Sequence, residues 1–490
     1  MVKFAGRGDV YLRHLEDRRK KVKQLLWGDF LNVVETDGEW FKVKWGPDHY
    51  WIRQADTQDE RPLEVVFVDV GQGDGCLLVS PETGAQEKVV LIDAGERRNM
   101  YNFVKWRFGK LKKKFHFHAA VITHSDQDHY GGFQPFFDQE AFSFTTVHHN
   151  GIAERAGDDL FGPSDASGTF LTDIAVTDER IRTLYADPQV RGGKKYPKLM
   201  QTALTSGRVG KVEMLSTASG TIEGGRAWMP GFSPTESPDL TIEVLGPVVE
   251  PDAAGQPRLR WLAGHDEGKT KNGHSVLLRL QHRGFTLLFG GDLNLPAEDF
   301  LLRHYAALAP GRPLAEAVGP ASSRLRADVM KSCHHGSADV TDEFLDAVNP
   351  FAFTVSSGDQ ESHVHPRPDL LGRLGRHGRG RAPLILCTEI LRSGRESEDA
   401  GILKRIDTLN GLIENPATPA IEREAHRKER AAAQARLGRR NVEVYGAITL
   451  RTDGRHLVIA FRLETEAGSG RRWQTYTFRD DPVEGFVPVA

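Results

Sequence analysis

Four residues that can bind metal ions fall within a short stretch of the sequence THSDQDHYGG, which begins at Thr123. His124, Asp126, Asp128 and His129 offer two imidazoles and two carboxylates. The apolar run AAVI precedes them, so a strand is predicted to end here and to direct these side chains into one small volume. Two such pairs can serve two cations about 4 Å apart. A polar loop with helix-capping aspartates is the structural alternative.

Further candidate ligands follow other apolar stretches of the chain. His274 lies in NGHS, before a strand pair that ends in the turn FGGD with Asp292. His334 and His335 lie in SCHHGS after another apolar strand, and His365 lies in HVHP. Each piece alone is more often a turn or a structural histidine. Together they supply the ligand types of a metal centre assembled from distant segments.

From Leu63 onward, apolar strands and glycine-rich turns alternate with one charged amphipathic stretch, which predicts a layered α/β domain over residues 61–480. Residues 148–238 are poor in periodic pattern, and we expect an insertion there. The stretch from about 392 to 440 is charged and helical in pattern, so it predicts a helical insertion near the C-terminus. The strands then return as VYGAITLRTDGRHLVIAF, a hairpin turned by Asp453-Gly454.

Residues 1–60 differ in sequence pattern from the rest of the chain. Short aromatic and β-branched runs, broken by Asp-Gly and Gly-Pro, predict a small barrel of short strands. This stretch resembles a bacterial barrel of the Src-homology-3 type, and a protein partner could bind through it. The polar sequence QADTQDERP is expected to link the barrel to the α/β domain.

The composition limits the cellular compartment and the kinds of partner that we expect for this protein. The 490 residues carry a formal net charge of −3, so attraction to nucleic acid must come from local basic patches. Three cysteines, Cys76, Cys333 and Cys387, lie far apart, which indicates a reducing compartment rather than a disulfide framework. We find neither a signal-peptide core nor an apolar run long enough to cross a bilayer. The sequence therefore predicts a cytoplasmic protein that does not enter membranes.

The motifs occur in an order that resembles metallo-β-lactamase-fold proteins, and specifically the metallohydrolase domain of the ComEC competence family. They are VVFVDVGQGDGCLLV, VVLIDAG, VITHSDQDHYGG, LLFGGD, SCHHGS and HVHP. The resemblance spans residues 63–389 and is specific in combination. It implies an αββα sandwich, two sheets back to back with helices outside, with two divalent metal ions at one edge.

The resemblance also implies a ligand set. The first ion would be held by His124, Asp126 and His274, the second by Asp128, His129 and His335, with Asp292 between them and His365 on the substrate phosphate. Asp126 stands where the family has a histidine, which moves the preference from zinc towards manganese. ComEC-like sequences often have NxxS without a histidine where this chain has NGHS, so His274 is assigned from the wider fold family. His334 is the alternative to His335.

Three more aspartates are expected near this site. By resemblance, DVGQGDG places Asp69 and Asp74 in nearby loops, with a tight glycine-rich turn as the alternative interpretation. Asp93 follows a buried strand, and we expect it to hydrogen-bond loop backbone or a metal-ligating histidine.

The predicted function is metal-dependent hydrolysis, with a phosphodiesterase or nuclease acting on nucleic acid as the leading hypothesis. Asp128 and Asp292 would orient the nucleophile, and His365 would neutralise a phosphoryl oxygen or help protonate the leaving oxygen. The basic stretches KWRFGKLKKKFHFH, RGGKKYPK and REAHRKERAAAQARLGRR favour nucleic acid. A hydrolase of cyclic nucleotides or lactones and a non-catalytic binding module are the alternatives.

Overall fold

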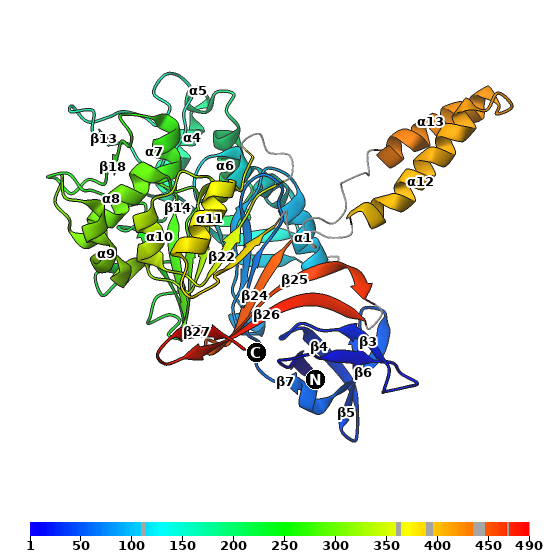
Figure 1. Cartoon of the computed structure of the whole chain (residues 1–490). Coiled ribbons are helices and arrows are strands. Elements are labelled where there is room, and N and C mark those ends of the chain that lie inside the picture. Colours follow the sequence, from blue (N-terminus) through cyan, green and yellow to red (C-terminus); the bar gives the residue numbers. More distant parts are fainter. Residues whose placement is uncertain (109–113, 359–363, 389–394, 435–445, 468–469, 490) are drawn as a thin grey trace.

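The computed structural model describes residues 1–108, 114–358, 364–388, 395–434, 446–467 and 470–489 (Figure 1). Within these residues, the strands form sheets of seven, ten, eight and two members. Helices alternate with the strands along the chain and cover the outer faces of the two large sheets, so the predicted mixed α/β class is confirmed. No helix in the described part of the chain is both long enough and apolar enough to span a membrane.

The N-terminal strands make one antiparallel sheet in the order β3-β2-β6-β5-β4-β1-β7. They are β1 (Val2–Ala5), β2 (Tyr11–Arg13), β3 (Lys21–Gln24), β4 (Phe30–Asp37), β5 (Trp40–Trp45), β6 (Asp48–Arg53) and β7 (Thr57–Gln58). Alternate residues of β4 and β5 are buried in a small core of their own. Within residues 1–58, which are all described, no pairing joins β3 to β7, so the structure shows an open sheet and not a closed barrel.

The ten-stranded sheet has the order β14-β12-β11-β10-β9-β8-β24-β25-β26-β27. Its strands are β8 (Leu63–Phe67), β9 (Gly75–Val79), β10 (Val89–Ala94), β11 (Phe115–Val121), β12 (Phe142–His149), β14 (Val209–Met214), β24 (Ile448–Thr452), β25 (His456–Ala467), β26 (Arg471–Asp481) and β27 (Gly485–Pro488). β10, β11, β12 and β14 run parallel. The predicted hairpin at Asp453-Gly454 is confirmed, since β24 and β25 pair antiparallel on either side of it.

The eight-stranded sheet has the order β15-β16-β17-β19-β20-β21-β22-β23. Its strands are β15 (Thr221–Glu223), β16 (Arg226–Trp228), β17 (Leu240–Gly246), β19 (Leu277–His282), β20 (Phe285–Phe289), β21 (Val329–Lys331), β22 (Ala352–Val355) and β23 (Leu384–Cys387). β20 to β23 run parallel. A small pair, β13 (Phe170–Leu171) and β18 (Leu259–Arg260), lies apart from both sheets in the pairing order.

Three clusters of buried side chains define the layers. The central cluster joins the two large sheets face to face, with Phe67 and Val121 from one and Leu280 and Phe289 from the other. A second cluster packs the ten-stranded sheet against α1 (Asn99–Arg107), α3 (Gln134–Asp138), α4 (Asp178–Ala186) and α6 (Lys195–Thr205). A third packs the eight-stranded sheet against α8 (Leu295–Ala306), α9 (Val318–Leu325), α10 (Asp342–Val348) and α11 (Pro368–His377).

The remaining helices are shorter or lie away from the sheets. They are α2 (Gln127–Tyr130), α5 (Pro188–Arg191), α7 (Glu267–Gly273), α12 (Arg395–Glu414), α13 (Ala420–Gln434) and the 3₁₀ turns η1 (Gln54–Asp56), η2 (Gly84–Gln86), η3 (Gly131–Phe133), η4 (Leu314–Ala317) and η5 (His334–Gly336). α12 and α13 pack on each other and extend away from the sheets (Figure 1). They fall within the stretch whose pattern predicts a helical insertion.

Parallel strands bring the polar segments of the sequence to one rim. β10 and β11 are parallel neighbours in one sheet, and β20 and β21 are parallel neighbours in the other. Asp93 lies at the end of β10, the motif from Thr123 follows β11, Asp292 follows β20 and η5 follows β21. Because the carboxyl ends of parallel strands share an edge, these four segments meet where the two sheets face each other.

Candidate metal centre

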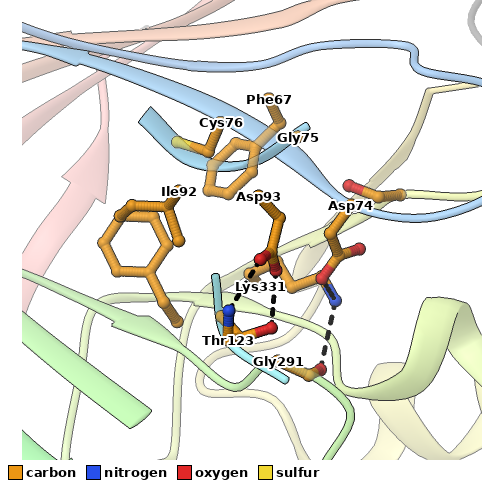
Figure 2. Close-up of a pocket in the computed structure, with 11 residues that line it drawn as sticks. Phe67, Asp74, Gly75, Cys76, Ile92, Asp93, Thr123, Gly291 and Lys331 are labelled. Atoms are coloured by element: carbon orange, nitrogen blue, oxygen red, sulfur yellow. Dashed lines mark hydrogen bonds and ion pairs between the residues drawn. The ribbon is translucent and has the colours of Figure 1, made fainter. Parts of the chain in front are cut away.

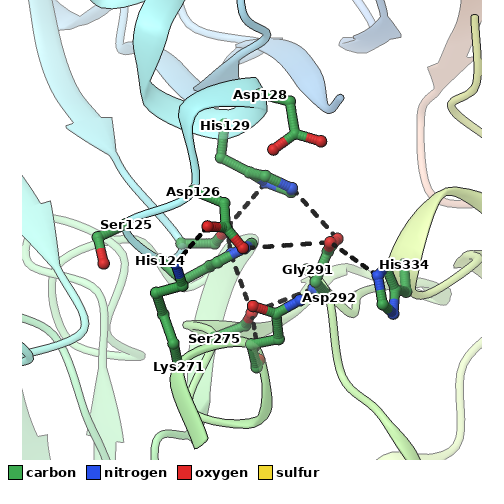
Figure 3. Close-up of polar contacts among 12 residues, drawn as sticks. His124, Ser125, Asp126, Asp128, His129, Lys271, Ser275, Gly291, Asp292 and His334 are labelled. Carbon is green, nitrogen blue, oxygen red and sulfur yellow. Dashed lines mark hydrogen bonds and ion pairs between the residues drawn. The ribbon is translucent and has the colours of Figure 1, made fainter. Parts of the chain in front are cut away.

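Four imidazoles lie around the carboxylate of Asp292, and Figure 3 shows three of them, those of His124, His129 and His334. Its Oδ1 is 3.2 Å from Nε2 of His129, and its Oδ2 is 3.2 Å from Nε2 of His335. The same Oδ2 is 3.8 Å from Nε2 of His334 and 4.0 Å from Nε2 of His124. His124 and His129 come from the motif after β11, and the other two histidines form η5. Residues far apart in the sequence therefore converge on one carboxylate, as a metal centre requires.

Second carboxylates fix the orientation of two of these rings. Nδ1 of His129 donates to Asp93 at 2.8 Å, and Nδ1 of His335 donates to Asp74 at 3.1 Å. In a neutral ring held this way, the lone pair is on Nε2. The two Nε2 atoms lie 3.2 Å apart, so two lone pairs face each other beside Asp292. A cation between these atoms would satisfy all three groups.

The hydrogen bonds predicted for Asp93 are confirmed. One oxygen accepts from the backbone N–H of Thr123 at 2.8 Å, and the other accepts from the Thr123 hydroxyl at 2.7 Å as well as from His129. Asp93 is almost wholly buried and adopts a left-handed backbone conformation with φ of 55°. This aspartate therefore ties the end of β10 to the start of the motif.

The charges at the rim also favour cations. Burial alone would lower the pKa of His129, but the carboxylates of Asp292 and Asp93 raise it well above its ordinary value. Burial likewise opposes the protonation of His335, and Asp292 and Asp74 raise its pKa well above the ordinary value. A metal ion bound here would compete with protons for these nitrogens.

Asp126 and Asp128, two residues apart in the motif, lie beside different histidines of the cluster. Oδ2 of Asp128 is 3.3 Å from Nε2 of His335 and accepts from Nε2 of Gln72 at 3.0 Å. Oδ2 of Asp126 is 3.4 Å from Nε2 of His124, and Oδ1 pairs with Lys271. The structure therefore brings together six of the predicted ligands, namely His124, Asp126, Asp128, His129, Asp292 and His335.

His274 does not join this group. Its ring is buried and Nε2 donates to the backbone carbonyl of Arg260 at 2.7 Å. The next residue, Ser275, faces the cluster instead, with its hydroxyl 3.3 Å from Nδ1 of His124 and accepting from the backbone N–H of Asp292 at 3.1 Å. α7 ends at Gly273, and His274 lies in the turn that caps it, with φ of −95° and ψ of 27°, so its side chain and that of Ser275 reach different partners. The NxxS spacing of ComEC-like sequences was the signal for Ser275.

His334 and His335 both face Asp292, so the structure does not exclude either of them as the candidate ligand. His335 is closer and almost fully buried, whereas the His334 side chain is 28% exposed. Both have left-handed backbones, with φ of 48° and 53°, a strained conformation that is typical of functional sites. His365 lies beside them at the rim, with its ring centroid 5.9 Å from that of His334.

The sequence interpretation missed Lys331, a buried lysine that lies beside Asp74 and Gly291 (Figure 2). Nζ of Lys331 pairs with Asp74 and donates to the carbonyl of Gly291 at 3.2 Å. Burial raises the pKa of the Asp74 carboxyl, but the charges of Lys331 and His335 lower it below its ordinary value. The sequence did contain a signal for this residue, because a lysine at the end of an apolar strand directly precedes SCHHGS. Lys331 therefore keeps Asp74 ionised as the acceptor for His335.

Asp69, in contrast, accepts from the backbone N–H of Gly71 in its own turn. The turn continues to Gly73, where a Cβ atom would lie 1.7 Å from the carbonyl oxygen of Asp128. Only glycine allows the loop to come this close to the motif. The loop thereby delivers Asp74 to the centre, next to a small cavity of about 20 Å³ between the sheets, enough for one water.

The donor set fits divalent cations. One ligand atom from each of Asp74, His129, Asp292 and His335 lies within 4.8 Å of the others, and all four side chains are buried. Nε2 of His124 is buried without a hydrogen bond to any described residue. Since Asp74 already engages Nδ1 of His335 and Lys331, Asp128 is the better placed carboxylate to face an ion. Imidazole and carboxylate ligands suit zinc and manganese.

No family model matches the chain. The chain is similar to ComE operon protein 3 of Bacillus subtilis (strain 168), with 23% identity over 330 residues. The aligned segment is 64% of this chain and 31% of that relative, so the chain spans less than a third of its length. The protein is thus a distant relative of ComEC-like proteins, and its buried aspartate and histidine cluster indicates a metal-dependent function.

Proposed function

We propose that the protein is a metallo-β-lactamase-fold hydrolase that uses two divalent ions, zinc or manganese, to cleave phosphodiester bonds in nucleic acid. The observation that carries this proposal is the convergence of four imidazoles on the Asp292 carboxylate. The order of the layers, in which helices cover the outer faces of two packed sheets, supports the metallo-β-lactamase fold. The rim position of the site, at the ends of parallel strands, supports it further.

Two sets of side chains would hold the ions. His124 and Asp126 form one set and Asp128, His129 and His335 form the other, with the carboxylate of Asp292 shared between them. When bound, the ions supply Lewis-acid charge and bring the pKa of water towards about 7. The roles of Asp74 and Asp93 are to hold the rings of His335 and His129 with Nε2 directed at the site.

The other residues act on the nucleophile and the substrate. Asp128 and Asp292 accept hydrogen bonds from the attacking water and so orient it towards phosphorus. His334 and His365, which lie together at the outer edge of the centre, face the phosphoryl oxygens and can donate to them. His365 is also placed to give a proton to the leaving oxygen.

A nucleic acid substrate is supported by one of the three basic stretches. Lys195, at the start of α6, donates to the side chain of Gln127 in α2 at 2.7 Å. The stretch RGGKKYPK therefore lies beside the site. The stretch that begins at Lys105 lies partly outside the described residues, and the described part of the third forms α13. We propose residues 61–480 as the hydrolase, with insertions at 148–238 and 392–440, and residues 1–60 as an accessory unit that binds a protein partner.

The test is turnover by the manganese-loaded and zinc-loaded protein on bis-p-nitrophenyl phosphate, linear DNA, RNA, cyclic nucleotides and a lactone. We expect phosphodiester cleavage, and loss of at least a hundredfold in Asp292→Asn. Asp138→Asn, which changes an exposed aspartate of α3, is the matched control and should retain full activity. Turnover of only the lactone or the cyclic nucleotides would show that the substrate is a small molecule and not nucleic acid. Metal binding without turnover of any substrate would refute the hydrolase.

A further inference from the structure

A lysine occupies one end of the candidate metal centre (Figure 3). Nζ of Lys271, on α7, pairs with Oδ1 of Asp126 and lies 3.6 Å from Oε1 of Glu154. The lysine side chain is 16% exposed, and Glu154 is 12% exposed and accepts from the Ser125 hydroxyl at 2.9 Å. The ammonium group therefore neutralises a carboxylate that would otherwise be available to a metal ion.

The two ends of the centre differ in this respect. Asp128, at the other end, accepts from the neutral amide of Gln72 and faces the imidazole of His335. The second nitrogen of that imidazole is held by Asp74, and His129 has a matching hydrogen bond to Asp93. This end thus has two imidazoles held with Nε2 directed at the site, and a carboxylate without an ammonium partner among the described residues.

The Asp126 end has fewer ligands and also holds the ammonium group of Lys271. Ser275 stands next to His124 where the sequence interpretation expected His274, so one imidazole is missing there. The amide of Asn272, in its better hydrogen-bonded orientation, donates to Oδ2 of Asp126 at 2.9 Å. Both oxygens of Asp126 therefore already have protein partners.

We propose that Lys271 and a divalent ion compete for Asp126, so that the centre binds one ion tightly and a second ion weakly. The tight position is formed by Asp128, His129, His335 and Asp292, and the weak one by His124, Asp126 and Asp292. The Lys271 ammonium group and a divalent ion would repel each other if both were in contact with Asp126, which carries a single negative charge. Glu154 is the nearest alternative partner for the lysine, so entry of the second ion moves Lys271 from Asp126 to Glu154. This inference rests on the proposed metal-dependent function.

The test is calorimetric titration of the full chain with manganese after treatment with a chelator, together with elemental analysis. We expect two classes of site in the unaltered protein. Lys271→Met should tighten the weak class at least tenfold and leave the tight class unchanged. Lys271→Arg, which keeps the charge, should leave both classes as they are. Lys269→Met is the matched control, because Lys269 lies on the same helix and pairs with Asp339 away from the centre.

Two equal sites in the unaltered protein, or a weak class that Lys271→Met leaves unchanged or weakens, would overturn the inference. Asp126→Asn provides an independent check, since it should abolish the weak class and keep the tight one; loss of both classes would also overturn it. Circular dichroism and thermal unfolding in chelator establish that each variant folds. Absence of metal binding in every variant, in contrast, would refute the proposed function itself.

Discussion

At the scale of single residues, the chemistry of the centre depends on which nitrogen of each ring is free. Asp93 and Asp74 hold Nδ1 of His129 and His335, and this leaves both Nε2 atoms directed at Asp292. Asp93 also accepts two hydrogen bonds from Thr123. One buried carboxylate therefore sets both the tautomer of a ligand and the path of the motif backbone.

We expect Asp93→Asn to weaken metal binding by about ten- to a hundredfold, because an amide can donate to Nδ1 and favour the wrong tautomer. Titration with manganese at neutral pH measures the change. Asp138→Asn is the control on an exposed helix face and should bind metal normally. Equal affinity in Asp93→Asn and the unaltered protein would mean that Asp93 does not orient His129.

Residue types and their position after apolar strands singled out the motif from Thr123, and the resemblance to ComEC-like sequences supplied the full set of candidate ligands. The structure brings most of these side chains together. Ser275 was missed in favour of His274, because the turn that ends α7 decides which of these neighbouring side chains faces the cluster, and the sequence pattern does not show the course of that turn. Lys331 was missed because its role depends on Asp74, a contact between distant segments that no local pattern records.

At the scale of elements, buried polar contacts connect helices behind the centre. Asn294 caps α8 by accepting from the backbone N–H of Ala297. One turn later, Glu298 accepts from the hydroxyl of Thr341 at 2.9 Å, and Thr341 in turn caps α10 by accepting from Phe344. Glu298 is fully buried, so α8 and α10 share a carboxyl group that is shielded from water.

Burial raises the pKa of Glu298 to about 8, from an ordinary value of 4.5. Between these values the folded protein retains a proton that the unfolded chain releases, so the free energy of unfolding decreases as the pH rises. The expected slope is up to about 1.4 kcal/mol per pH unit. Glu298→Gln should remove this contribution and be more stable than the unaltered protein at pH 8.

Urea unfolding in chelator, measured from pH 5 to pH 8, provides the comparison. The control is Glu316→Gln, an exposed carboxylate on η4, which should preserve the slope of the unaltered protein. Identical pH profiles for Glu298→Gln and the unaltered protein would show that Glu298 does not titrate in this range.

At the scale of the whole molecule, the N-terminal sheet packs on the C-terminal strands of the ten-stranded sheet. Leu26 and Trp27 share a buried cluster with Val458 and Ala460 of β25. The short strands of residues 1–58 and the Asp453-Gly454 hairpin followed from local sequence patterns. Their packing on each other could not be predicted, because it joins residues more than four hundred positions apart and leaves no periodic signal.

The guanidinium group of Arg451 is the polar centre of this packing. Nη1 donates to the carbonyl of Trp27 at 2.6 Å and to Asp29 at 2.8 Å, and Nη2 donates to Glu64 at 2.9 Å. Arg451 is 4% exposed and Glu64 is 3% exposed. Burial raises the pKa of Glu64, but the charges of Arg107 and Arg451 lower it to about 2, so Glu64 is ionised at neutral pH.

Arg451→Met should therefore lower the free energy of unfolding by about 3–5 kcal/mol, because it leaves the Glu64 carboxylate and the Trp27 carbonyl buried without this partner. Arg479→Met, on the exposed side of β26, is the matched control and should change the stability by less than about 0.5 kcal/mol. Denaturant titration at neutral pH measures both variants. A loss of less than about 1 kcal/mol in Arg451→Met would place the contact among weak surface ion pairs, and the N-terminal sheet would then be held by its apolar contacts alone.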